Sequence, residues 1–361
     1  MSRLHLALIA VFALTSCGGS SNTSGGKFAY VTNDESGDVS AYAIDANSGA
    51  LTPVRGSPFK AGMNTSDAAI VPSGKFAYVA NAGDSDVSAY AIDASSGALT
   101  PVRGSPFKAG ERPRDVAIDP SGKFLYVSNV YSKDVSAYAI DASSGALTPV
   151  VGSPFKEGGP GSSGGMAIDP NGKFAYVANG GGDNVSAYAI DARNGALTPV
   201  RGSPFKAGGT PGSVAIDPGG KFAYVTNSHS NDVSAYAIDA RSGALTPVRG
   251  SPFKAGGAPS GLAIDPNGKF AYVANAVDGD ISAYAIEARS GALTPVVGSP
   301  FKAGRSPGEV AVDPTDKFVY VSNVWSNDVS AYTIDARSGA LTPVVGSPFK
   351  AGTAPRGVAI R

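Results

Sequence analysis

A sevenfold repeat is the feature of this sequence that most limits how the chain can fold. The string GKFAYV, or a close variant of it, recurs with its lysine at Lys27, Lys75, Lys123, Lys173, Lys221, Lys269 and Lys317. The spacing between successive lysines is 48 residues, except for one interval of 50. The seven copies fill residues 27–361 with no linker of different composition. This range is therefore predicted to be one domain built from repeated units.

Each repeat has the pattern of four short β-strands. In the third copy we expect strands A to D at residues 116–119, 123–129, 134–141 and 147–155. Turn residues separate them at 119–122 and 143–145. Strand D contains two prolines, which cannot donate to a ladder, so it is expected at a sheet edge. Four-stranded units repeated at this interval are typical of propeller blades. The predicted fold is an all-β, seven-bladed β-propeller of four-stranded antiparallel blades.

The alternation of side chains within a repeat predicts how the blades stack. Phe124 and Tyr126 alternate with smaller aliphatic residues in the strand at 123–129, and Tyr138 and Ile140 alternate with alanines in the strand at 134–141. Side chains of a strand point alternately to its two faces. We therefore expect a sheet with one bulky face and one small face, which stacks well on a copy of itself.

The two ends of the repeat region predict that the ring is closed. The first copy begins at strand B and has no strand A, whereas residues 357–361 form a strand A with nothing after it. An open solenoid is the alternative, but it would leave both fragments unpaired. The last strand is therefore predicted to complete the first blade, which removes the open edges of the ring.

The first residues have the pattern of a targeting segment. Arg3 precedes the apolar stretch 4–14, and Leu14-Thr15-Ser16-Cys17 follows, with the only cysteine of the chain. This pattern resembles a bacterial lipoprotein signal, and an ordinary secretory signal with an incidental cysteine is the alternative. We expect a signal peptide at residues 1–16, lipidation of Cys17, a flexible tether through residue 26, and the propeller at 27–361. The expected location is the bacterial cell envelope, lipid-anchored at the outer membrane or in the periplasm.

Charge and composition limit the possible partners. The chain has 29 basic and 29 acidic residues, a net charge of zero. This balance argues against nucleic-acid binding, which requires clustered basic residues, and leaves the lipid anchor as the only expected membrane contact. His229 is the only histidine after the signal segment, and alone it cannot build a zinc or haem site. The sequence therefore predicts no cofactor and no metal site.

The loops differ more between copies than the turns do. If strand A runs down the channel, the B–C and D–A loops lie together at one face, and the A–B and C–D turns lie at the other. The turns barely vary among the copies, whereas the B–C and D–A loops vary most. Because functional residues tend to lie on loops held by a rigid scaffold, the face with the B–C and D–A loops is the predicted functional face.

Charged residues on these loops are predicted to occupy one side of the channel mouth. The D–A loops place acidic or arginine residues on blades 7, 1, 2 and 3, whereas blades 4 to 6 offer only glycine and serine there. The second position of the B–C loops adds two aromatic residues on flanking blades, and one histidine on blade 5, opposite the charges. The candidate ligand-binding residues are Asp67, Arg114, Asp115, Tyr131, His229, Trp325, Glu309 and Arg356.

Two interpretations of these charges remain open. The arginines can bind a carboxylate, a phosphate or an oxyanion, and the carboxylates can bind sugar hydroxyls or act in acid–base chemistry. Alternatively, the charges only solvate the loop tips and neutralise one another, as neighbouring exposed ion pairs often do.

The repeated YVTN or YVAN, the strand VSAYAID and the segment GALTPVRGSPFKAG resemble the seven-bladed lactonase-type propellers over residues 27–361. That family includes 6-phosphogluconolactonase-like enzymes, carboxymuconate lactonizing enzymes and YVTN propellers. The resemblance implies a propeller with a site at one channel mouth, where family enzymes use His, Arg and Glu side chains. Three functions are expected: binding of a small polar ligand or an envelope protein or glycan; hydrolysis of a lactone or sugar-acid ester; or a structural platform.

Overall fold

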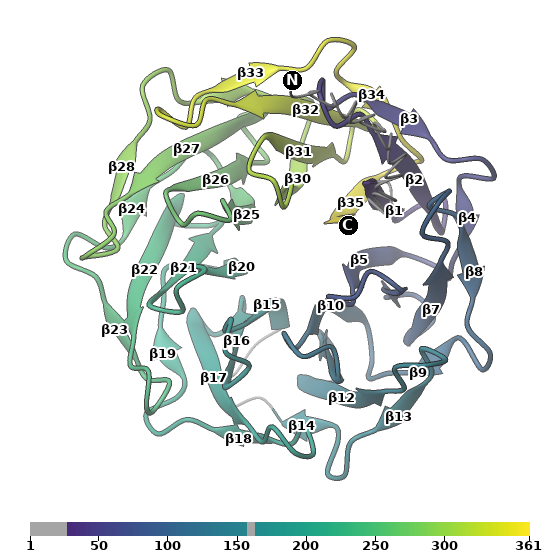
Figure 1. Cartoon of the computed structure of the whole chain (residues 1–361). Helices are drawn as coiled ribbons and strands as arrows, with labels where there is room; N and C mark the ends of the chain where they lie inside the picture. The colour runs from purple at the N-terminus through teal and green to yellow at the C-terminus, as the bar shows by residue number, and fades with distance from the viewer. Residues whose placement is uncertain (1–26, 157–162) are drawn as a thin grey trace, which may run out of the picture.

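Seven antiparallel sheets surround a central channel in the computed structural model, which describes residues 27–156 and 163–361 (Figure 1). Each sheet is one blade, and its first strand lines the channel while its last strands form the rim. Blade 1 contains β35 and β1–β4, blade 2 contains β5–β9, and the remaining blades follow in chain order. The predicted seven-bladed all-β propeller is confirmed. Among the described residues, no helix has the length and apolar character needed to cross a bilayer.

The inner strands are β5 (Thr65–Ile70), β10 (Pro113–Ile118), β15 (Ser163–Ile168), β20 (Pro211–Ile216), β25 (Pro259–Ile264), β30 (Pro307–Val312) and β35 (Pro355–Ile360). The second strands are β1 (Phe28–Asn33), β6 (Phe76–Asn81), β11 (Phe124–Asn129), β16 (Phe174–Asn179), β21 (Phe222–Asn227), β26 (Phe270–Asn275) and β31 (Phe318–Asn323). The third strands are β2 (Asp38–Ile44), β7 (Asp86–Ile92), β12 (Asp134–Ile140), β17 (Asn184–Ile190), β22 (Asp232–Ile238), β27 (Asp280–Ile286) and β32 (Asp328–Ile334).

The outer edge of each blade is two short strands where the sequence predicted one. They are β3 (Leu51–Pro53) and β4 (Phe59–Lys60), β8 (Leu99–Pro101) and β9 (Phe107–Lys108), β13 (Leu147–Pro149) and β14 (Phe155–Lys156), β18 (Leu197–Pro199) and β19 (Phe205–Lys206), β23 (Leu245–Pro247) and β24 (Phe253–Lys254), β28 (Leu293–Pro295) and β29 (Phe301–Lys302), and β33 (Leu341–Pro343) and β34 (Phe349–Lys350). Both members of each pair hydrogen-bond the third strand.

The single strand predicted at 147–155 is interrupted for a physical reason. Its two prolines, Pro149 and Pro154, have no N–H to donate, and Gly152 between them has a φ of 90°. The chain leaves the hydrogen-bond ladder there. The N–H of Ala137 in the third strand then donates to the Ser153 hydroxyl at 2.9 Å. The inner strand of the same blade also begins at Pro113, earlier than the expected start at residue 116.

The closure of the ring predicted from the two chain ends is confirmed. β35 pairs antiparallel with β1, with Ala359 opposite Tyr30 and Val358 opposite Val31. Figure 1 shows the yellow C-terminal strand beside the purple first strand at the channel. At the start of β1, the Lys27 ammonium donates to Asp313 of the A–B turn of blade 7 at 3.2 Å. The first described residue therefore lies at the face that carries the A–B turns.

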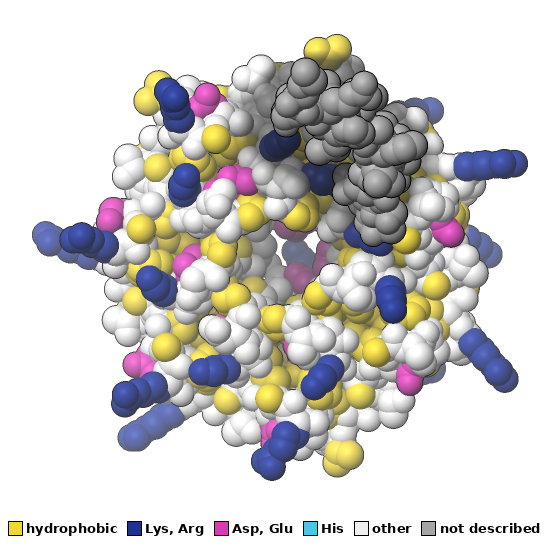
Figure 2. Space-filling model, viewed as in Figure 1, with side chains coloured by type: hydrophobic (Ala, Val, Ile, Leu, Met, Phe, Trp, Pro, Cys, Tyr) yellow, Lys and Arg dark blue, Asp and Glu magenta, His cyan; other side chains and the backbone are white. Residues whose placement is uncertain are grey.

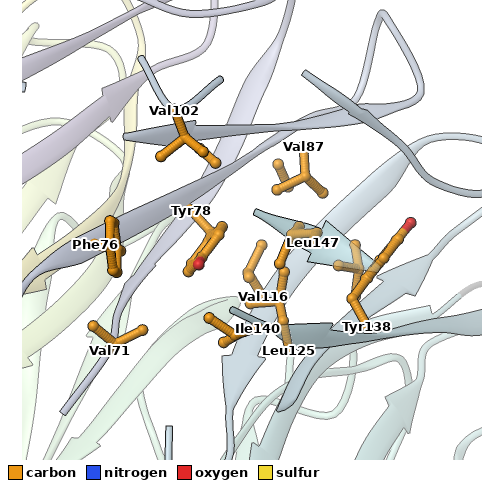
Figure 3. Close-up of a cluster of buried hydrophobic side chains, with 13 residues drawn as sticks. Val71, Phe76, Tyr78, Val87, Val102, Val116, Leu125, Tyr138, Ile140 and Leu147 are labelled. Carbon is orange, nitrogen blue, oxygen red and sulfur yellow. The ribbon is translucent and has the colours of Figure 1, made fainter. Parts of the chain in front are cut away.

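The expected division into one bulky and one small face is wrong. Tyr126 of β11 pairs with Ala137 of β12, and Leu125 pairs with Tyr138. Since directly paired residues share a face, each face carries the large side chains of one strand beside the smaller side chains of the next. Figure 3 shows such an interface, where Tyr78 of blade 2 packs in one cluster with Leu125 of blade 3.

Buried tyrosines join each blade to its neighbours. The Tyr30 hydroxyl of β1 donates to the carbonyl of Gly97 in the C–D turn of blade 2 at 2.9 Å. The Tyr42 hydroxyl of β2 donates to the carbonyl of Lys350 in blade 7 at 2.6 Å. Equivalent bonds recur between the other blades, including Tyr320 to Gly49 across the closure. The repeat thus encodes its own interfaces.

The asparagine that ends each YVTN or YVAN segment fixes the loops at the other face. Asn81 accepts the N–H of Gly62 at 3.1 Å and donates to Asp86 and Ser88 at 2.7 and 2.8 Å. A Cβ atom on Gly62 would lie 2.6 Å from Asn81 Cγ, so only glycine fits there. The D–A loop is also bonded to the B–C loop, since the N–H of Gly83 donates to Met63 at 2.9 Å. These contacts hold both loops at the channel mouth.

Candidate functional site

A cavity of about 1130 Å³ occupies one end of the channel. Its wall comes from the D–A loops, the first residues of the inner strands and the B–C loops, and none comes from the A–B or C–D turns. Figure 2 shows that the ring is open at its centre, with basic and acidic side chains inside the opening. The cavity is therefore at the face that the sequence comparison of the loops selected.

Among the residues that the structure describes, the charged side chains of the cavity wall lie on one side. Asp67, Arg114, Asp115, Glu309 and Arg356 all line it. Across from them the corresponding positions of blades 4, 5 and 6 are Gly165, Ser213 and Gly261, which also line it. A ligand in this cavity would meet charged groups on one side and backbone and hydroxyl groups on the other.

The two aspartates are held by the backbone of the next blade. Asp67 Oδ2 accepts the N–H of Val116 at 3.2 Å, and Asp115 Oδ2 accepts the N–H of Met166 at 3.1 Å. These N–H groups belong to inner strands, whose channel side has no further strand to bond them. Each carboxyl group therefore satisfies a backbone donor that would otherwise lack a partner within the protein.

Burial in the channel wall disfavours the ionised form of all three carboxyl groups. Burial, reinforced by the charges of Asp115 and Glu309, raises the pKa of Asp67 well above its usual value. Burial raises the pKa of Asp115 to about 6, although Met166 and Arg114 act against it. Burial and the charge of Asp115 raise the pKa of Glu309 to about 8. Glu309 therefore keeps its proton to a higher pH than Asp115 does.

The two arginines differ in their partners. Arg356 Nε lies 2.6 Å from Asp34 Oδ2, and Asp34 Oδ1 also accepts a hydrogen bond from Asn64 at 3.0 Å. Arg114 forms no ion pair or hydrogen bond with any residue that the structure describes, although it keeps accessible surface toward the cavity. Burial lowers the pKa of Arg114, but a guanidinium remains protonated at neutral pH. The Arg114 side chain thus presents to the cavity a positive charge that forms no ion pair with the described residues.

The three B–C loop candidates are placed differently. Tyr131 lines the cavity, and the Arg112 guanidinium lies 5.0 Å from the centre of its ring and donates to its hydroxyl at 2.7 Å. Trp325, 69% exposed, and His229 do not belong to the cavity wall. The structure therefore brings together six of the eight candidate residues and leaves these two outside.

The sequence comparison considered the second position of each B–C loop, whereas the first position lines the cavity in all seven blades. The residues there are Asp34, Ala82, Val130, Gly180, Ser228, Ala276 and Val324. Asp34, the partner of Arg356, was missed for this reason. It is the only charged residue among the seven, so the same comparison at the first position would have found it. Arg112 was also missed.

No group of three or more His, Cys, Asp and Glu side chains arranged to hold a metal ion occurs among residues 27–156 and 163–361. The side chains that line the cavity carry carboxyl, guanidinium, phenol and hydroxyl groups. Together these groups can bind an anion, accept a proton and donate a proton.

The titration of Glu309 makes stability depend on pH. In the unfolded chain this carboxyl ionises near 4.5, but in the fold only near 8. The wild type should therefore lose stability as pH rises from about 5 to 8, because the unfolded state releases the proton first. Glu309→Gln removes this effect. We expect about equal stability of both proteins at pH 4 and an advantage of up to about 5 kcal/mol for the variant at pH 9.

Urea unfolding at both pH values measures this difference. Ser213→Ala, on the uncharged side of the cavity, is the matched control and should follow the wild type at each pH. Parallel curves for Glu309→Gln and the wild type would show that Glu309 titrates normally.

Fold and cavity together define a class, the seven-bladed β-propellers with a polar cavity at one channel mouth. Comparison with family models assigns the chain within it: the model described as "Lactonase, 7-bladed beta-propeller" matches residues 20–162, 156–258 and 250–356. The chain belongs to this family of seven-bladed β-propeller lactonases. The resemblance noted in the sequence is thereby confirmed. A search of curated proteins finds no match.

Solved structures with similar folds include three named as lactonases. A putative 6-phosphogluconolactonase from Bacteroides fragilis has a TM-score of 0.83 at 22% identity, covering 94% of this chain and 99% of that one. A second, from Bacteroides uniformis, has a TM-score of 0.81 at 19% identity, covering 93% and 100%. The periplasmic gluconolactonase of Pseudomonas aeruginosa has a TM-score of 0.79 at 21% identity, covering 92% and 99%. At these identities the likeness shows the shared fold.

Proposed function

We propose that the cavity binds a small hydroxylated carboxylic acid or its lactone, held by the guanidinium of Arg114. The observation that carries this proposal is the Arg114 guanidinium in the wall of a polar cavity, which forms no ion pair with any residue in 27–156 and 163–361. A guanidinium binds a carboxylate or carbonyl oxygen with two parallel hydrogen bonds and strong directionality. The opposite side, with Gly165, Ser213 and Gly261, leaves room for the body of the ligand. The volume, about 1130 Å³, is slightly larger than the range of about 300–1000 Å³ that is usual for small-molecule sites.

Hydrolysis of a lactone is the second candidate function. It is favoured by one observation: Asp115 and Glu309 lie in one cavity with pKa values of about 6 and about 8. Two groups that titrate on opposite sides of neutral pH can act as base and acid. The family and the names of the three similar structures support the same chemistry.

Asp115, Glu309 and Arg114 can together supply every proton transfer and the charge stabilisation that this reaction requires. The oxygen of a water molecule attacks the lactone carbonyl carbon while Asp115 accepts a proton from that water. Arg114 stabilises the resulting oxyanion. The ring carbon–oxygen bond then breaks, and the leaving oxygen takes the proton of Glu309. Solvent carries a proton from Asp115 back to Glu309, which restores the starting state and leaves the hydroxy acid as product.

Calorimetric titration with gluconate, 6-phosphogluconate and their lactones tests the binding proposal. Arg114→Ala should weaken binding by about 1.5–3 kcal/mol, the value of a charge-assisted hydrogen bond, which is about 10- to 150-fold in Kd. Arg356→Ala should have a smaller effect, because Asp34 already neutralises that guanidinium. Ser213→Ala, on the uncharged side, should bind like the wild type.

Equal effects of Arg114→Ala and Ser213→Ala would contradict the proposal. Failure of the wild type to bind any of the four compounds would favour the structural platform, with the charges serving only the fold. Binding of all four with no hydrolysis of the lactones would retain the binding function and exclude the second candidate.

We also propose that Cys17 anchors the protein in the cell envelope. This cysteine and the rest of residues 1–26 lie outside the described residues, so the proposal depends on the sequence pattern at 3–17. The periplasmic gluconolactonase of Pseudomonas aeruginosa, similar in fold, supports an envelope location for this kind of propeller.

A further inference from the structure

We propose that the cavity contains a second subsite, formed by Glu111, Arg112 and Tyr131, which binds an additional sugar ring of the ligand. The ligand is then a sugar acid or lactone that carries a second, glycosidically linked sugar ring. This inference rests on the proposed binding function and defines the class of ligand more narrowly. None of the three side chains takes part in the proposed reaction.

The three residues lie together in blade 3. Glu111 and Arg112 belong to the D–A loop that leads into β10, and Tyr131 belongs to the B–C loop that follows β11. All three line the cavity. Two backbone hydrogen bonds join the loops: the N–H of Val130 donates to the Arg112 carbonyl at 2.9 Å, and the N–H of Tyr131 donates to the Glu111 carbonyl at 3.1 Å. The subsite is therefore held in place by its own backbone.

The Tyr131 side chain is fixed by Arg112 and still open to a ligand. The Arg112 guanidinium lies 5.0 Å from the centre of the ring and donates to the phenol oxygen at 2.7 Å. The tyrosine nevertheless remains 62% exposed. An aromatic ring held in this way offers a flat apolar surface with a polar tip. The C–H face of a sugar ring can pack on such a surface while its hydroxyl groups bind the neighbouring polar side chains.

The charges of the subsite favour a neutral ring over a second acidic group. Glu111 and Arg112 are adjacent in the chain and carry opposite charges, so their sum is zero. The carboxylate accepts hydrogen bonds and the guanidinium donates them, which together suits the hydroxyl groups of a sugar. Arg114, in contrast, forms no ion pair with the described residues. The acidic end of the ligand therefore binds at Arg114, and the neutral ring binds at Tyr131.

The spacing and the size of the cavity leave room for this second ring. Arg112 and Arg114 are two residues apart, so at most about 7 Å separates their Cα atoms. One further sugar ring is enough to extend a ligand over this distance. The cavity volume of about 1130 Å³ also exceeds the usual range for small-molecule sites, and a single sugar acid is small among such ligands.

Calorimetric titration of the full chain with gluconate and lactobionate, which is gluconate carrying a galactose ring, tests the inference. The wild type should bind lactobionate about fivefold to tenfold more tightly than gluconate, because the second ring packs on Tyr131. Tyr131→Ala should remove this difference and leave the Kd of gluconate unchanged. Tyr131→Phe keeps the aromatic ring and should retain most of the difference.

Trp325→Ala is the matched control, because Trp325 is an exposed aromatic residue at the same loop position in blade 7 but does not line the cavity. It should bind both compounds like the wild type. Arg112→Ala should weaken binding of lactobionate and leave binding of 6-phosphogluconate unchanged. Thermal unfolding of each variant checks that the propeller is intact.

Three results would overturn the inference while the proposed function stands. The first is equal affinity of the wild type for gluconate and lactobionate. The second is a preference for lactobionate that survives Tyr131→Ala. The third is an Arg112→Ala variant that loses more affinity for 6-phosphogluconate than for lactobionate, since the subsite would then bind a second acidic group. If neither gluconate nor lactobionate binds the wild type, the inference and the proposed function are both wrong.

Discussion

A chain that lacks Gly357–Arg361 should melt about 10 °C or more below the full-length protein, or aggregate. These residues form most of β35, which pairs with the channel-side edge of β1. Their loss removes Val358 and Ala359 from two blade interfaces. It also exposes the edge of β1 and the faces of the inner strands β5 and β30 that contact β35. Thermal unfolding followed by circular dichroism measures the effect.

A circular permutant is the control for this deletion. Moving residues 353–361 in front of Lys27 makes blade 1 continuous in sequence while keeping every strand of the ring. This permutant should recover most of the lost melting temperature, which separates the missing strand from the shortened chain. A deletion that melts like the full-length protein would show that β35 is not needed to hold the ring closed.

Cys17→Ser should release the protein from the membrane fraction almost completely. Cys17 is the only cysteine of the chain, so no second thiol can replace it as the lipidation site, and several acyl chains together give stable anchoring. The wild type should require detergent for extraction and carry the added mass of the acyl groups. The variant should be found as a soluble or uncleaved form by fractionation and mass spectrometry.

Ser20→Ala is the matched control, because it changes a neighbouring small residue and leaves the cysteine intact. It should fractionate like the wild type. A processed Cys17→Ser protein that still fractionates with membranes would show that the segment is an ordinary secretory signal.

Repetition explains why the fold was predictable. The same strand pattern occurs in seven copies, so the strand assignment in one copy is supported by the other six. The incomplete copies at the two ends predicted the pairing of β35 with β1, which the structure shows. The details that failed depend on backbone geometry. Pro149 and Pro154 indicated an edge strand, but only the structure shows that the chain leaves the ladder between them. The strand register places large and small side chains together on each face, which alternation within a single strand could not predict, because alternation does not show that Tyr126 aligns with Ala137.

The candidate site was predictable in place but not in its internal pairing. Position in the repeat brought Asp67, Arg114, Asp115, Glu309 and Arg356 to one side of the channel, where the structure also places them. The sequence comparison gave no difference between Arg114 and Arg356, because they occupy equivalent positions in their repeats. Only side-chain positions show that Asp34 engages Arg356 and that Arg114 is unpaired among the described residues. The hydrogen bonds that Asp67 and Asp115 accept from the backbone of the next blade likewise depend on interatomic distances, which a sequence pattern does not contain.

The direction of β1 has a consequence for how the protein would be oriented at a surface. Lys27 lies against Asp313 in an A–B turn, at the end of the channel opposite the cavity. If Cys17 carries the acyl groups, the lipid attachment leads to this end of the propeller. The cavity mouth would then point away from the bilayer into the aqueous compartment. In that orientation, dissolved molecules could enter the cavity directly from the aqueous compartment. Neither the bilayer nor the lipid tether would block the cavity mouth.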